Sequence, residues 1–581
     1  MINILIKKNI FIKRTNFLSF FLLFLALQIC FVNINFAQKF KLKVIKVDSV
    51  DFKYIDKKKY NNVINDSISI YSELEFVLKI LQKKGFASAS FDKIEFVNNN
   101  CYAYLYIGSK FVISDINVIN KNSKTLRKTN LFDKKFKNKS FNEKEVNSNY
   151  KSVLESFENK GYPFVKINQD SFNILNQKIS IKISVNPNNS IYIRNIFVKS
   201  EKNVNERLLL KYLKIRKNEL YNEKKLQQIE QLTNKSSFVK TIKFPEIEFF
   251  KDSADLYIYV KPEKANFFNG IIGFLPKKEN SGKLLVTGEL AIDLSNNLRR
   301  NETLSLNWKR NEAESQKLQG NFRYPYLFNT YFGINLGLQI EKKDTSYLVS
   351  NIRYGVNYFF ICDDYIELFM LNRNSVILSK NIPQSENFSE SKAKLYGFSI
   401  KTENTDYKFN PRLGYKFLAE ISSGQKQTKN LKNTNLYEAF FNFEYYIPIV
   451  GKFVLKSKAT GKYMFSNLDF YVNELNKFGG FNSLRGFDED EILATEFSML
   501  SLEMRYLYEK KSNFFVFFES AYFKRKSVTE KFNDTPFGFG LGTLFETQAG
   551  FFSISYALGK QQSNPIQLSG SKVHFGYINR F

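Results

Sequence analysis

A glycine-rich stretch late in the chain carries the residues best suited to chemistry or recognition. It reads Gly479, Gly480, Phe481, Asn482, Ser483, Leu484, Arg485, Gly486, Phe487. Glycine accepts positive φ and lets backbones approach closely, so this stretch is expected to fold as a tight turn and not to continue a strand. An arginine on such a turn can reach a polar interior and form charge-assisted hydrogen bonds with an acidic side chain. An ordinary glycine-rich surface loop is the alternative interpretation.

Other residues offer little for catalysis. The chain has no Gly-x-Ser-x-Gly nucleophile elbow, no phosphate-binding P-loop and no His-Glu-x-x-His motif. His574 is the only histidine, and a strand residue facing the inside of a barrel is its best interpretation. Cys101 and Cys362 are far apart and are expected in different domains, so neither a disulfide framework nor a cysteine metal site is predicted. We therefore expect no enzyme, no bound cofactor and no metal.

The composition favours short β-strands. Aromatic residues make up 16% of the chain, with 61 Phe and 33 Tyr but a single Trp, Trp308. Many short aromatic segments separated by Asn, Lys, Ser and Gly suit strands better than helices. The net charge of +30 would suit nucleic acid, but the lysines are spread along the whole chain and no known nucleic-acid motif appears. Nucleic acid is therefore not an expected partner.

The first residues resemble a targeting segment. Basic residues at 7–14 precede an apolar run from Phe17 to Val32, and the small residue Ala37 follows. This layout predicts a secretory signal peptide over residues 1–37, with a retained anchor as the alternative. No later segment offers about 18 uninterrupted apolar residues, so a membrane protein built of helices is not expected.

Residues 40–262 combine helical and strand patterns that recur along the chain. One helix face is formed by Leu74, Val77, Leu78 and Leu81. Asn142 and Glu145 are expected to form a capping box at the start of a second helix. The pairs that follow the helices are spaced by 76 residues in each step: Gly85-Phe86, Gly161-Tyr162 and Ser237-Phe238. A fixed interval predicts tandem domains at 38–110, 111–188 and 189–264, although two domains after an irregular leader would also fit.

The remainder, residues 265–581, is predicted to be almost entirely strand. Leu304, Leu306 and Trp308 alternate with polar residues, and the same alternation recurs up to the C-terminus. A membrane β-barrel shows this pattern, as would a soluble sandwich. At roughly 10 residues per strand plus turns, about sixteen strands fit.

Two of these features resemble a known family. The strand–helix–helix–strand–strand order with its Lys-Gly-Tyr-Pro-Phe turn resembles the POTRA domain, and the longer Gly-Gly-x-x-x-Leu-Arg-Gly-Phe string resembles the large-loop motif of the BamA/TamA and two-partner-secretion transporter superfamily. The resemblance implies α+β POTRA-like repeats followed by an all-β antiparallel transmembrane barrel. It also implies that the loop folds into the barrel, where Arg485 contacts an acidic residue. Glu519 is the best candidate.

The resemblance further implies insertion or export of proteins in the outer membrane of a Gram-negative bacterium, with the repeats in the periplasm. The expected partners are unfolded outer-membrane or secreted polypeptides, outer-membrane lipid, and chaperones or accessory proteins. A seam between the first and last strands would open for the client, and Gly270 and Gly273 would weaken its first strand. The last strand, with Gly576 and the terminal Phe581, resembles the C-terminal signal by which barrels are recognised for outer-membrane insertion. An exporter of one dedicated partner and a passive porin remain the alternatives.

Overall fold

The structure is a computed structural model that describes residues 40–48, 60–64, 66–118, 137–202, 204–236, 238–263, 266–276, 284–310, 315–378, 388–407, 410–429, 431–547, 550–562, 566 and 568–580. The predicted signal peptide, Ala265 and Phe581 lie outside these ranges. The chain divides into two units, residues 1–189 and 190–581. Within the described ranges, no helix is long and apolar enough to cross a membrane.

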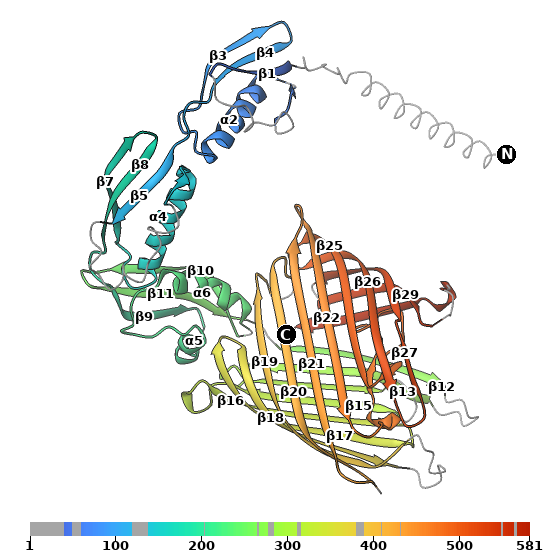
Figure 1. Cartoon of the computed structure of the whole chain (residues 1–581). Helices are drawn as coiled ribbons and strands as arrows, with labels where there is room; N and C mark the ends of the chain where they lie inside the picture. The colour runs from blue at the N-terminus through green and yellow to red at the C-terminus, as the bar shows by residue number, and fades with distance from the viewer. Residues whose placement is uncertain are drawn as a thin grey trace, which may run out of the picture. The chain divides into compact units, whose positions relative to one another are not determined.

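The first unit contains two mixed sheets, each covered by a helix (Figure 1). The first sheet has the order β2-β1-β4-β3, and its elements are β1 (Phe40–Lys46), β2 (Val63–Ile64), α2 (Ser67–Lys83), β3 (Ser90–Val97) and β4 (Asn100–Tyr106). Helix α2 begins at Asp66, whose carboxylate accepts from the Ser69 N–H at 2.7 Å. It buries Leu74, Val77 and Leu81, the face predicted from their spacing. Gly85 follows the helix at φ +99°.

The second sheet repeats this arrangement in the order β6-β5-β8-β7. Its elements are β5 (Val112–Val118), β6 (Lys139–Ser140), α4 (Glu143–Glu158), β7 (Lys166–Leu175) and β8 (Lys178–Asn186). The predicted capping box is wrong. Asn142 is the N-cap of α4, but its side chain makes no capping bond, and its carbonyl oxygen accepts from the Glu145 and Val146 N–H groups. The Glu145 N–H, which a capping side chain would have bound, is therefore satisfied by the backbone.

A third mixed sheet opens the second unit. It contains β9 (Tyr192–Ser200), α5 (Glu206–Tyr212), α6 (Glu223–Lys235), β10 (Val239–Phe249) and β11 (Ser253–Pro262), with the order β10-β11-β9. Both predicted helices are present here. In the first two sheets, the segments where a further helix was expected, residues 49–59 and 119–136, lie outside the described ranges.

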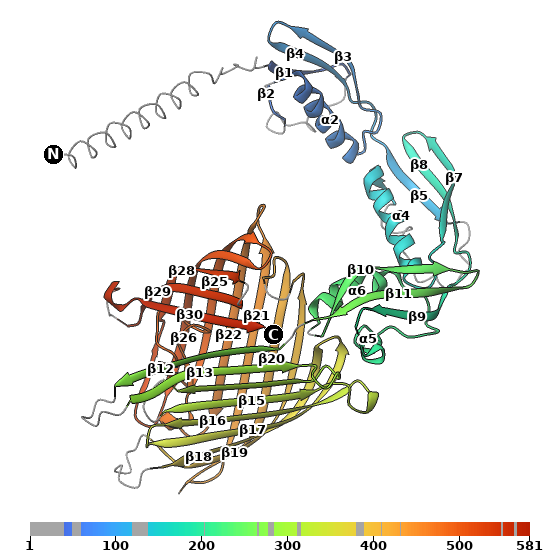
Figure 2. The ribbon, with the colours of Figure 1, turned by 180° about the vertical axis from the view of Figure 1, so that it is seen from behind.

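The remaining strands that the structure describes close into an antiparallel barrel (Figures 1 and 2). They are β12 (Phe267–Pro276), β13 (Leu284–Ser295), β14 (Thr303–Arg310), β15 (Gln316–Tyr324), β16 (Phe332–Lys343), β17 (Tyr347–Ile361), β18 (Asp364–Ile377), β19 (Ser391–Thr405), β20 (Gly414–Thr428), β21 (Thr434–Pro448), β22 (Phe453–Ser466), β25 (Glu496–Glu509), β26 (Ser512–Lys526), β27 (Lys531–Asp534), β28 (Phe537–Thr547), β29 (Gly550–Lys560) and β30 (Lys572–Arg580). Strands β27 and β28 pair with the same neighbour, β26, and form one interrupted strand. The barrel therefore has sixteen strand positions, as predicted.

Each barrel strand alternates between two environments. On β25, Leu500, Leu502 and Met504 are exposed on the outer face, whereas Ser501 and Glu503 are buried. Alternate side chains point to opposite faces of a strand, so apolar residues cover the outside and polar residues line the interior. This arrangement, with the mixed sheets before it, confirms the predicted fold class.

The third sheet shares its core with turns of the barrel. Tyr326, Phe359 and Cys362 are buried in one cluster with residues of α5, α6 and β9–β11. The Tyr212 hydroxyl donates to Asp363 Oδ2 at 3.2 Å, and burial raises the pKa of Tyr212 well above its usual value. Burial also raises the pKa of the Cys362 thiol. This end of the barrel, which we call the domain end, is thus joined to the third sheet.

Candidate functional site

The segment between β22 and β25, residues 467–495, folds back into the barrel, and we call it the lumen loop. A short hairpin forms its stem, with β23 (Asn476–Phe478) paired to β24 (Ile492–Ala494). The glycine-rich stretch lies between these strands and is called the glycine turn, Gly479–Phe487. Its Leu484 and Phe487 are buried against inward-facing wall residues such as Phe523. Apolar burial therefore holds the loop inside.

Arg485 is the polar anchor of the glycine turn, and only 6% of it is exposed. Its backbone N–H donates to Glu519 Oε2 at 2.8 Å, and its Nε donates to Glu519 Oε1 at 3.0 Å. Its Nη2 donates to Glu503 Oε1 at 2.8 Å and also contacts Glu519. The guanidinium carbon lies 3.6 Å from the ring centroid of Phe517. Because one planar guanidinium donates to two carboxylates, both the position and the orientation of the Arg485 side chain are fixed.

The two carboxylates are themselves held by the wall. Glu519 accepts from Ser501 Oγ at 2.9 Å, and Glu503 accepts from Arg505 at 2.9 and 2.6 Å. Lys456 lies 4.0 Å from Glu503. Burial of a charge is costly unless it is paired and hydrogen-bonded, and every charge in this cluster has partners. The structure thus brings together Arg485 and Glu519, the pair expected from sequence, and adds Glu503.

Glycines bring the turn into contact with the wall. Gly479, Gly480 and Gly486 have φ values of +123°, +97° and +95°. A Cβ added to Gly538 on β28 would lie 2.0 Å from the Arg485 carbonyl oxygen, and one added to Gly559 on β29 would lie 2.5 Å from that of Gly486. Only glycine permits so close an approach of two backbones.

The loop continues into an acidic tip, Asp488–Asp490, whose three carboxylates contact three lysines. The pairs are Asp488–Lys572 at 2.7 Å, Glu489–Lys309 at 3.8 Å and Asp490–Lys317 at 3.1 Å. Lys572 belongs to the last strand, β30, whereas Lys309 and Lys317 belong to β14 and β15. The tip therefore bridges strands from both ends of the barrel sequence.

Between these strands lies the seam, where β12 and β30 close the barrel (Figure 2). Among the described residues, only two pairs join them, Phe267 with Arg580 and Phe268 with Asn579. By contrast, ten pairs join β12 to β13 and seven join β29 to β30. Each missing pair leaves backbone donors and acceptors without ladder partners. The seam is thus the weakest strand pairing of this region.

The expected seam residues have distinct positions. Gly270 and Gly273 lie in β12 beyond its two pairs with β30, and Gly576 pairs with Ser553 of β29. A Cβ on Gly576 would approach the Phe481 ring of the glycine turn at 3.4 Å. His574 faces the same turn, and its Nε2 accepts from the Gly486 N–H at 3.4 Å. The last strand is thus in contact with the loop.

Comparison of the sequence with known proteins identifies the family of the barrel. None of the curated proteins compared with the chain matches it in sequence. Residues 296–581, however, match the model of the Omp85 superfamily domain. The barrel is an Omp85 superfamily domain. The family resemblance predicted from the glycine turn is thereby confirmed.

Two solved structures of CdiB share the fold of this chain at low sequence identity. CdiB from Acinetobacter baumannii has 12% identity and a TM-score of 0.50, with coverage of 82% of this chain and 90% of that chain. CdiB from Escherichia coli has 14% identity and a TM-score of 0.50, with coverage of 82% and 91%. BamA from Haemophilus ducreyi lacking POTRA domains 1–3 has 17% identity, a TM-score of 0.42, and coverage of 81% and 100%.

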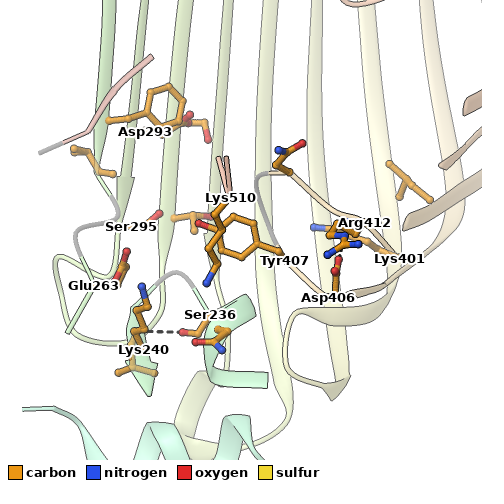
Figure 3. A pocket seen from close by; sticks show the side chains of 18 of the residues that line it. Ser236, Lys240, Glu263, Asp293, Ser295, Lys401, Asp406, Tyr407, Arg412 and Lys510 are labelled. Atoms are coloured by element: carbon orange, nitrogen blue, oxygen red, sulfur yellow. Dashed lines mark hydrogen bonds between the residues drawn. The ribbon is translucent and has the colours of Figure 1, made fainter. Parts of the chain in front are cut away.

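The Omp85 barrel opens into a cavity of about 880 Å³ at the domain end (Figure 3). Its lining includes residues of the third sheet and of the barrel, among them the cations Lys240, Arg323, Lys401, Arg412 and Lys510. Phe267, the first residue of the seam strand β12, also lines it. The cavity thus connects the domain end with the seam.

Sequence reasoning missed several residues of this site. Glu503 and Ser501 look like ordinary inward positions of a strand, and only the β25–β26 register places them beside Glu519. The Asp-Glu-Asp tip is visible in the sequence directly after the glycine turn, but its lysine partners lie elsewhere in the chain. Among the described residues, no group of three or more His, Cys, Asp or Glu is placed to hold a metal.

Proposed function

We propose that the chain is an outer-membrane protein assembly or translocation factor of a Gram-negative bacterium. It would capture unfolded clients through its POTRA-like domains in the periplasm and insert or export them through its barrel. The observation that carries this proposal is the seam of two residue pairs, bridged by a loop that Arg485 anchors to the wall. Outer-membrane or secreted polypeptides are the clients, and chaperones or accessory proteins are further partners.

The seam supports strand exchange as the mechanism. Hydrocarbon cannot hydrogen-bond open backbone groups, so a strand edge opened at the seam must find a new partner. An incoming client strand supplies one by pairing with β12 or β30. Because only two pairs join β12 and β30 in the part of the chain that the structure describes, the energetic cost of opening is small relative to other joints of the wall.

The edges of the mixed sheets support client capture. Strands β3, β7 and β10 each lie at one edge of their sheets. On β7, Phe172, Ile174 and Leu175 are exposed. An extended segment can add to such an edge through backbone hydrogen bonds, which gives broad selectivity.

A disulfide across the seam tests the proposal. Phe268→Cys with Asn579→Cys places two thiols directly opposite each other, in a chain whose Cys101 and Cys362 are replaced by Ala. Oxidation should stop client delivery, and reduction should restore it. The matched control, Gln339→Cys with Asn351→Cys, locks an interior joint between β16 and β17 and should leave delivery intact.

The same experiment separates the alternatives. A passive porin would conduct equally well with the seam locked, and delivery that survives the lock would overturn the proposal. An exporter of one dedicated partner differs in its client, which cross-linked capture from intact cells identifies. A single captured partner would favour export, and many barrel precursors would favour insertion.

A further inference from the structure

The outer face of the barrel changes from apolar to polar on four neighbouring strands, β17 to β20. Residues that pair across these four strands and face outward form rows around the barrel. We describe the rows in order of increasing distance from the domain end. One apolar row is Val356, Leu368, Phe398 and Ile421, and the next is Tyr354, Met370, Tyr396 and Ser423. The following two rows are mainly polar: Ile352, Asn372, Lys394, Gln425, then Ser350, Asn374, Lys392, Gln427. The polar rows begin where the apolar band ends.

The height of this apolar band matches a hydrocarbon layer. On β21, next to β20, outward apolar side chains run from Ile447 to Tyr437, which pairs with Ser423 of the second apolar row. Ten residue steps at about 3.3 Å each give roughly 33 Å along the strand, and a strand tilt of about 40° reduces this to roughly 25 Å of height, the height of the apolar band of outer-membrane barrels. The polar rows thus lie at the level of lipid headgroups, on the side of the barrel opposite the domain end.

A shallow groove of about 380 Å³ lies on these polar rows. Lys392 and Lys394 line it together with the amide side chains of Asn372, Asn374, Gln425 and Gln427. No carboxylate is among the described residues that line it. Lysine attracts a phosphate as a point charge, and amide N–H groups donate to its oxygens.

Some lysines of the barrel surface are paired with carboxylates, and within the described part of the chain Lys392 and Lys394 are not. Lys524 on β26 is paired with Glu496 at 3.3 Å, and Lys531 on β27 is paired with Asp469 at 2.6 Å. Among the ion pairs of the described residues, neither Lys392 nor Lys394 has a carboxylate partner. Their positive charge is therefore available to an anion from outside the chain.

We propose that the Lys392–Lys394 groove binds the phosphate-bearing headgroup of an outer-leaflet glycolipid. The acyl chains would cover Leu368 and Ile421, which are 66% and 62% exposed in the apolar rows beneath the groove. The inference rests on the membrane placement in the proposed function, but not on client handling. It assigns a fixed lipid to one wall of the barrel, away from the seam.

The test uses the purified full-length protein in a neutral detergent and native mass spectrometry. The probes are lipid A with two phosphates, the same lipid without phosphates, and inorganic phosphate as competitor. We expect phosphorylated lipid A to bind and Lys392→Gln with Lys394→Gln to weaken it about tenfold or more. The control, Lys524→Gln with Lys531→Gln, removes two carboxylate-paired lysines and should change binding less than twofold.

Equal binding of the dephosphorylated lipid, or unchanged binding by the Lys392 and Lys394 variant, would overturn the proposal. So would inorganic phosphate displacing the lipid at equal concentration, because the site would then belong to free phosphate. Heat-shifted migration on gels verifies that each variant retains its barrel. Client delivery by the same variant should be normal, so failure of lipid binding and failure of the proposed function are distinguishable.

Discussion

The lumen loop is held at two regions that differ in kind. At Arg485, buried carboxylates, an aromatic ring and close glycine contacts surround one cation. At the acidic tip, three ion pairs connect to separate strands, and Asp488 is 69% exposed. A buried pair resists breaking because each partner would be left uncompensated, whereas an exposed pair exchanges readily with water and salt. The comparison assigns a permanent anchor to Arg485 and a releasable bridge to the exposed Asp488–Lys572 pair of the tip, whereas Glu489 and Asp490 are only about a third exposed.

The largest effect is expected from removing the anchor. Arg485→Ala leaves Glu519 without its cation in a buried site, so the closed loop should lose about 3–5 kcal/mol. We expect client delivery to fail while the barrel still forms. Delivery is measured by the amount of client folded in or across the membrane, and barrel formation by heat-shifted migration.

Arg373→Ala is the matched control for this variant. Arg373 is also held in the barrel wall and donates to Glu438 at 2.6 and 3.1 Å, away from the glycine turn. It should destabilise the barrel by a similar amount yet keep delivery. Normal delivery by Arg485→Ala would remove the loop from the mechanism and leave the anchor with only a structural role.

A smaller effect is expected from lifting the turn off the wall without touching a charge. The added methyl group of Gly538→Ala meets the Arg485 carbonyl oxygen, a backbone atom that can yield only if the turn moves. Overpacking of this kind costs about 1–3 kcal/mol. We expect reduced delivery and faster protease cleavage in the lumen loop. Gly320→Ala, whose Cβ would meet only Leu306 at 3.8 Å, is the control.

The sequence predicted the Arg485 anchor but not the ion pairs of the acidic tip, and the difference has a physical reason. The glycine turn combines its special backbone needs and its arginine within nine residues, and an acidic residue on a later strand is a natural partner. The bridge depends on which strands the tip reaches inside a closed barrel, and alternation along one strand does not reveal the neighbours of another. Lys309, Lys317 and Lys572 look like ordinary strand lysines in an abundantly basic chain.

The architecture shows the same difference between features that depend on local sequence pattern and features that depend on contacts between distant segments. Alternation and length predicted a barrel of about sixteen strands, because both depend on local pattern and chain reach. The capping box at Asn142 and Glu145 was wrong because backbone acceptors at the helix start replaced the side chain. The shared core around Cys362 was not predicted, since it joins a turn of the barrel to a sheet more than a hundred residues earlier.

The smallest effect is expected at the acidic tip. This test shows whether the ion pair between the tip and β30 keeps the seam closed. Lys572→Glu places like charges against Asp488 and should cost about 0.2–1 kcal/mol, as surface pairs do. Seam opening is measured in the Phe268→Cys, Asn579→Cys chain, kept reduced, as the rate at which its two introduced thiols react with a thiol reagent. We expect Lys572→Glu to raise that rate severalfold, and high salt to raise it in the parent chain.

Combining Lys572→Glu with Asp488→Lys restores an ion pair of opposite polarity and should return the rate to that of the parent. If each substitution only destabilised the structure around β30, the double variant would not recover. Its thiols would then react at least as fast as those of the single variant. If the double variant reacts as fast as the single one, the tip contacts the wall without holding the seam. Recovery would instead show that strands at opposite ends of the barrel sequence are coupled through the loop that Arg485 anchors.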